Sequence, residues 1–151
     1  MTGLRISSPA FEDGEPIPEE YGYTERNVNP PFRFDSVPDE AETLALIVDD
    51  PDAVEPAGKV WDHWVVWNVP ADRDEIPEDW GAADAVEGVN DYGERGYGGP
   101  NPPDGEHTYR IELYAVEASV DLASSAGADD LRAALEGKIV ETATMEGTYA
   151  P

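Results

Sequence analysis

Glycine and proline interrupt this sequence at short intervals, and that spacing restricts its fold more than any other feature. The 151 residues include 14 of each, and the segments between them are short apolar or alternating runs. Because Gly and Pro break regular elements and alternation matches the two-residue period of a strand, the pattern predicts many short strands joined by turns. Length and continuity predict a single domain, residues 1–151.

Six segments have the pattern of strands, and one has that of a helix. The predicted strands are Leu4–Ser8, Phe32–Phe34, Leu44–Val48, Trp61–Val69, Tyr109–Val116 and Ile139–Tyr149. Residues 44–48 are apolar throughout, which is typical of a strand buried on both faces. In the strand 61–69, we expect Trp61, His63, Val65 and Trp67 on one face. The chain is therefore predicted to be β-rich, with one or two small helices.

The predicted helix covers Asp129–Glu136. Its acidic start favours the positive end of the helix dipole, Leu131 and Leu135 share one face, and Gly137 suits the C-cap. The segment Pro77–Gly96 is long for a structureless connection, so we expect it to have a function or local structure.

The charge of the chain excludes two classes of partner. It has 34 acidic and 9 basic residues, for a formal net charge of -25. Binding to nucleic acid or to an anionic membrane surface needs clustered Lys and Arg, so neither is expected. Acids spread along the whole chain, with only two lysines, predict a halophilic source, where salt screens the self-repulsion.

Several further features are missing from the sequence. There is no cysteine, which excludes disulfides, thiolate metal sites and cysteine nucleophiles. No apolar run is long enough to span a membrane, and the opening residues do not have the pattern of a signal peptide. The expected location is therefore the cytoplasm, and no cofactor is expected.

Both histidines are near loops of special composition. His63 follows Asp49-Asp50-Pro51-Asp52, and His107 follows a Gly-Pro-rich loop over residues 96–103. If the ends of the three strands concerned meet, two His and two or three Asp will line one cavity.

Three interpretations of this cluster remain open. The residues can be structural, since an Asp-Pro-Asp segment is often a turn. They can hold a divalent metal, although the short H-x-x-x-H spacing is missing. They can bind a phosphate or carboxylate through imidazole and backbone N–H groups, with the Asp carboxylates suited to the ammonium of a zwitterion.

Common enzyme motifs are absent: the sequence has no G-x-S-x-G, no phosphate-binding G-x-x-x-x-G-K-[ST] and no H-E-x-x-H. A hydrolase that uses Asp50, Asp52 and His107 is kept as a minor alternative, because paired carboxylates can serve in acid–base chemistry.

The sequence resembles the phosphatidylethanolamine-binding protein family, in its bacterial and archaeal Raf-kinase-inhibitor-like branch. The resemblance covers nearly the whole chain, including the opening SSPAFEDGEPIPEEY and NVNPPFRF. The other matching blocks are LALIVDDPDA (44–53), WDHWVVWNVP (61–70), IPE (76–78), GYGGPNPPDGEHTYRIELYAV (96–116) and LEGKIVETATMEGTY (135–149).

The resemblance implies a mostly β fold: a Greek-key sandwich of two antiparallel sheets, with one or two small helices near the C-terminus. It also implies a non-enzymatic protein with an anion pocket at one end of the sandwich. The ligand-binding residues carried over by motif are Asp50, Asp52, His63, Gly98, Gly99, Pro100, His107 and Tyr109. The alternative is an inhibitor of a kinase or protease, or a signalling scaffold, acting through a partner protein. Relatives in this branch often form homodimers.

We assign roles within that pocket. His63 and His107 are expected to donate hydrogen bonds, and the backbone amides of 98–101 to cradle the anion. Asp50 and Asp52 would orient the rings or hold a cation, and Tyr109 would donate its hydroxyl.

The sequence departs from the family pattern at three points. Asn101 stands where relatives often have Cys, which excludes a redox role, and Thr108 stands where Arg is usual. The Gly-Pro loop is longer than in animal members. Either Gly99-Pro100 or Asn101-Pro102 can therefore form the edge of the pocket.

Overall fold

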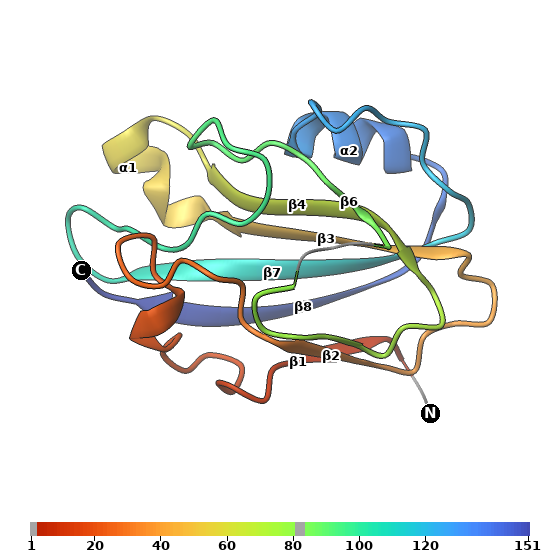
Figure 1. Cartoon of the computed structure of the whole chain (residues 1–151), viewed down its shortest axis with the longest axis horizontal. Coiled ribbons are helices and arrows are strands. Elements are labelled where there is room, and N and C mark those ends of the chain that lie inside the picture. Colours follow the sequence, from red (N-terminus) through yellow and green to blue (C-terminus); the bar gives the residue numbers. More distant parts are fainter. Residues whose placement is uncertain (1–2, 81–83) are drawn as a thin grey trace.

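The computed structural model describes residues 3–80 and 84–151, and in them two antiparallel sheets face each other (Figure 1). The larger sheet has the order β6 (Val86–Glu87), β4 (Trp61–Pro70), β3 (Thr43–Asp50), β7 (His107–Val116) and β8 (Ile139–Tyr149). The smaller sheet has the order β1 (Arg5–Ser7), β2 (Phe32–Asp35) and β5 (Glu75–Ile76). The expected two-sheet β fold is confirmed.

The helices are short and lie in different parts of the chain. α2 (Ala128–Leu135) lies near the C-terminus as expected, whereas α1 (Val54–Ala57) follows β3. Single 3₁₀ turns occupy Glu19–Tyr21 and Pro51–Ala53. Over residues 3–80 and 84–151, no helix has the length and apolar character that crossing a bilayer requires.

β3 is the centre of the fold because both of its faces are covered, and each of its residues is buried. On one face, Leu46 and Val48 pack into the core beneath the smaller sheet. On the other face, Ala45 and Ile47 pack into a second core closed by α2. Burial on both faces explains the continuous apolar run of this segment.

The segment Pro77–Gly96 has local structure, as its length predicts. It contains β6, which pairs with β4, and a bridge between Val89 and Arg95. Asn90 is buried and organises the turn: its amide oxygen accepts from the backbone N–H groups of Tyr92 and Glu94. Residues 81–83 lie outside the described residues.

A register shift between β3 and β4 places His63. Val48 pairs with Trp64 and Asp49 with Asp62, so His63 faces no residue of β3, a strand described along its whole length. An extra residue of this kind is a β-bulge, which turns the following side chains relative to the preceding ones.

The expectation that Trp61, His63, Val65 and Trp67 share a face is wrong for this reason. Val65 and Trp67 belong to the core under α2. Trp61 and His63 instead line a cavity on the opposite face, together with Tyr109 of β7. Simple alternation along a strand fails wherever a bulge changes the count.

Candidate functional site

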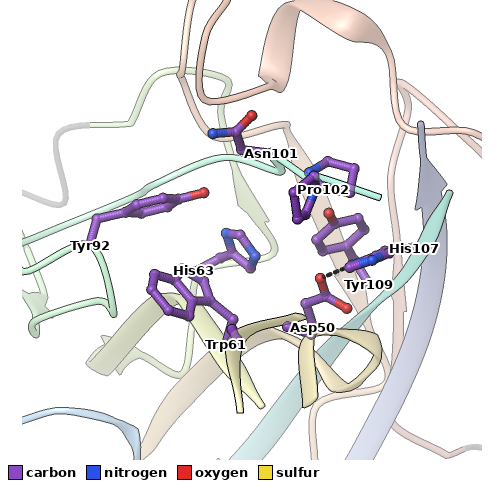
Figure 2. Close-up of a pocket in the computed structure, with 11 residues that line it drawn as sticks. Asp50, Trp61, His63, Tyr92, Asn101, Pro102, His107 and Tyr109 are labelled. Atoms are coloured by element: carbon purple, nitrogen blue, oxygen red, sulfur yellow. Dashed lines mark hydrogen bonds and ion pairs between the residues drawn. The ribbon is translucent and has the colours of Figure 1, made fainter. Parts of the chain in front are cut away.

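A cavity of about 170 Å³ opens at one end of the larger sheet, where β3 ends and where β4 and β7 begin. The antiparallel order of these neighbouring strands brings those three ends together. Figure 2 shows the side chains that converge on it: Asp50, Trp61, His63, Tyr92, Asn101, Pro102, His107 and Tyr109. At roughly 30 Å³ for a water molecule, the cavity has room for a small headgroup.

The structure places four of the carried-over residues in this cavity: Asp50, His63, His107 and Tyr109. Asp52 is next to it and exposed, and its carboxylate accepts a hydrogen bond from the backbone N–H of Thr108 at 2.8 Å. The strand ends thus bring the predicted His and Asp residues together across the sheet, although Asp52 does not line the cavity wall.

Gly98, Gly99 and Pro100 lie behind the wall, and their backbone does not form the expected amide cradle. Gly98 N–H donates to the carbonyl of His63 at 2.9 Å, and Gly99 N–H donates to Asn27 Oδ1 at 2.7 Å. Proline has no N–H to offer. The loop is drawn inward by these bonds, so its next residues, 101–103, form the edge of the cavity.

His107 is held between two carboxylates. Its Nδ1 is 2.6 Å from Asp50 Oδ2, and its Nε2 is 2.7 Å from Asp104 Oδ1. Burial lowers the pKa of His107, but the hydrogen bonds to Asp50 and Asp104 outweigh it and raise the pKa above the ordinary value. An imidazolium is the form that donates at both nitrogens.

The pKa of His63 is shifted in the opposite direction from that of His107. The His63 ring is almost wholly buried, which lowers its pKa despite a hydrogen bond from Nδ1 to the carbonyl of Gly98 at 2.7 Å. Since that carbonyl can only accept, Nδ1 carries the proton of the neutral ring. Nε2 is then an acceptor, and the donor role expected of His63 toward a ligand would require the protonated ring.

Two buried donors at the cavity are unsatisfied. The hydroxyl of Tyr109 and the indole N–H of Trp61 have no hydrogen-bond partner among the residues that the structure describes. Burial raises the pKa of Tyr109, and the charge of Asp50 raises it further, so the hydroxyl keeps its proton. The Asp50 carboxylate is near this hydroxyl but does not meet it in hydrogen-bond geometry. Buried polar groups normally have partners, so two such donors at one cavity are unusual.

Trp61 and Tyr92 also line the cavity, and motif reasoning did not assign them; Asn101, a candidate edge residue from the sequence, lines it as well. The Tyr92 ring stacks on Tyr23 at 3.9 Å between centroids, and its hydroxyl donates to the carbonyl of Gly99 at 2.8 Å. The signals available in the sequence were the length of the segment 77–96 and the Asn101-Pro102 alternative. Neither identifies an individual side chain.

In the described part of the chain, no group of three or more His, Cys, Asp or Glu side chains is arranged to hold a metal ion. Among the described residues, the arrangement instead has two donors without partners and an acceptor nitrogen beside a buried imidazolium–carboxylate pair.

Comparison with known proteins gives one consistent family. The model of the family described as phosphatidylethanolamine-binding protein matches residues 7–150. A UPF0098 protein of Methanothermobacter thermautotrophicus is 40% identical, with 97% of this chain and 98% of the relative covered. A UPF0098 protein of Chlamydia muridarum is 38% identical, over the same shares of the two chains.

Two solved structures are similar throughout. The putative phosphatidylethanolamine-binding protein homologue CT736 of Chlamydia trachomatis has a TM-score of 0.92 at 36% identity, over 99% of this chain and 98% of that one. YbcL of E. coli, described as a member of the mammalian family, has a TM-score of 0.90 at 28% identity, over 98% of each chain.

Proposed function

The chain belongs to the phosphatidylethanolamine-binding protein family, and from that premise we propose that its cavity binds a small anionic or phosphorylated group of the headgroup type. Family membership makes it, in general terms, a ligand-binding protein. The proposed contacts are Trp61, His63, His107 and Tyr109, with Asp50 holding His107. Binding without catalysis is part of the proposal.

The pair of unpartnered donors is the observation that carries this proposal. The Tyr109 hydroxyl and the Trp61 indole N–H are buried at one cavity and lack acceptors among the described residues. A buried donor without a partner costs about 1–3 kcal/mol. A ligand oxygen that accepts from both groups would recover this free energy, and phosphate oxygens are good acceptors.

The charges around the cavity further restrict the class of ligand. The chain has a net charge of -25, and Asp50 is beside the cavity, so a bare anion meets repulsion. A ligand that also carries a donor, such as an ammonium or hydroxyl group, can offset this repulsion by bonding to His63 Nε2. Phosphoethanolamine combines both features in a molecule small enough for the cavity.

Titration calorimetry at high salt tests the proposal with inorganic phosphate, phosphoethanolamine and acetate. The decisive variant is Tyr109→Phe, which removes one unsatisfied hydroxyl and leaves the ring in place. We expect saturable binding by the wild type and about tenfold weaker binding by the variant, since a hydrogen bond to a charged group contributes about 1.5–3 kcal/mol.

Tyr114→Phe is the matched control, because Tyr114 is on the same strand but packs into the core under α2. It should bind like the wild type. Absence of heat from all three ligands, or equal affinities in the two variants, would overturn the proposal. A panel of phosphate and carboxyl esters checks its non-enzymatic part.

A further inference from the structure

We infer that Asp104 is a tethered competitor: its carboxylate occupies the nitrogen of His107 that an anionic ligand would otherwise contact. This inference rests on the proposed function of the cavity. It assigns to Asp104 the role of weakening anion binding, so that a ligand must displace this side chain before it can bond to His107.

The two nitrogens of His107 face different surroundings. Nδ1 meets Asp50, whose side chain is 4% exposed, and Nε2 meets Asp104, whose side chain is 53% exposed. Nε2 is therefore on the solvent side of the ring. Because His107 lines the cavity, Nε2 is the nitrogen that a ligand arriving from solvent can reach.

Asp50 cannot give way in the same manner. It is buried at the end of β3, and its other oxygen accepts from the backbone N–H of Asp52 at 2.9 Å. Its removal from His107 would leave a carboxylate without a counter-ion in the interior, which is costly. Asp104 can instead turn into water.

The loop around Asp104 allows that movement. Asp104 and Glu106 are exposed, and a Cβ added at Gly105 would meet no atom within 4 Å, so the tip of the loop is loosely packed. Within residues 3–80 and 84–151, the Asp104 side chain makes one hydrogen bond, to His107. The neighbouring residues 101–103 already form the cavity edge.

Tethering determines how strongly Asp104 competes. It is three residues before His107, and a short flexible tether gives an effective concentration in the millimolar range. A free anion must compete for His107 with the Asp104 carboxylate at this effective concentration. Removing the carboxylate should therefore tighten anion binding, whereas removing a residue that supports the site only structurally would weaken it. The sign of the change distinguishes the two roles.

The test compares Asp104→Ala with Glu106→Ala by titration with inorganic phosphate at high salt. Both variants remove one exposed negative charge from the same loop, but only Asp104 contacts His107. We expect phosphate affinity to rise about tenfold in Asp104→Ala and less than twofold in Glu106→Ala. Asp104→Asn, which keeps the shape without the charge, should fall between the wild type and Asp104→Ala.

The outcomes separate this inference from the function beneath it. If the wild type binds phosphate and Asp104→Ala binds no more tightly, the competitor role is wrong and the anion pocket stands. If phosphate affinity rises equally in Asp104→Ala and Glu106→Ala, the increase comes from the loss of one negative charge in the loop. That result would also overturn the inference. If neither the wild type nor Asp104→Ala binds phosphate, the competitor role is wrong. The proposed function fails with it only if phosphoethanolamine and acetate also give no heat with the wild type.

Discussion

Asp49 and Asp50 are adjacent in the chain, but their carboxylates lie on opposite faces of the larger sheet and hold different partners. Asp50 bonds to His107 at the cavity at 2.6 Å. Asp49 is fully buried and accepts from Arg110 at 2.8 Å and from Arg132 of α2 at 3.0 Å. One dipeptide at the end of β3 thus links the candidate site to the helix on the other face.

The ion pairs of Asp49 should be important for stability. Asp49→Asn removes the fully buried carboxylate that pairs with Arg110 and Arg132, whose side chains are each 35% exposed. We expect the free energy of unfolding in urea at high salt to fall by about 3 kcal/mol, the cost of breaking a buried ion pair. Glu112→Gln is the control, because Glu112 meets the same arginines only at 3.7 and 3.5 Å. The free energy of unfolding of Glu112→Gln should fall by less than about 1 kcal/mol.

A side chain at position 99 should disrupt the wall behind the cavity. A Cβ on Gly99 would overlap the carbonyl oxygen of Tyr21 and approach the backbone of Gly22 and Tyr23, none of which can move away cheaply. We expect Gly99→Ala to cost about 1–3 kcal/mol in urea unfolding, the usual range for overpacking. Gly127→Ala, whose Cβ would be 3.6 Å from its nearest neighbour, should cost less than about 1 kcal/mol. Similar costs in both variants would contradict this account.

The two histidines should titrate on opposite sides of the ordinary value of 6.5. Proton NMR should give His107 a pKa above it, because the bonds to Asp50 and Asp104 outweigh burial, and His63 a pKa below it, because of burial. Asp104→Asn should lower the pKa of His107 and leave that of His63 unchanged. Overlapping curves for the two rings would be incompatible with the hydrogen bonds described.

These shifts fix the sign of the pH dependence of stability. The raised pKa of His107 stabilises the fold fully below pH 6.5, and this contribution is lost as the pH rises through the higher, folded value. The depressed pKa of His63 stabilises the fold above pH 6.5, and this is lost as the pH falls through the lower, folded value. In urea unfolding, His63→Gln should therefore reduce the loss of stability below pH 6.5.

Salt should stabilise the protein. With 34 acidic and 9 basic residues, the folded chain repels itself, and molar salt shortens the Debye length to about 3 Å. We expect the melting temperature to rise steadily between low and molar KCl, as the halophilic interpretation of the composition requires. A melting temperature that is flat or falls over this range would refute that interpretation.

Local patterns in the sequence were sufficient for the six longer strands and for α2, but not for the short β5, β6 and α1. The apolar run 44–48 reflects a strand buried on both faces, and the Leu131–Leu135 pair reflects the buried side of a helix. The structure shows both. Such periodicities are short-range consequences of backbone geometry, so they can be read without knowing the fold. The blocks around Asp50, His63 and His107 also identified the family.

The detailed site depends on contacts between segments far apart in the chain, which periodicity does not contain. The bulge that directs His63 into the cavity depends on the register of β4 against β3. The N–H groups of Gly98 and Gly99 bond to His63 and Asn27 and do not face the cavity. The fold of residues 77–96 places Tyr92 at the cavity. The sequence by itself determined the six longer strands, the family and four of the residues that line the cavity. Only the tertiary structure decided which hydrogen bonds those groups form with one another and which donors remain free, because each buried polar group bonds to whatever partner the packing brings within reach.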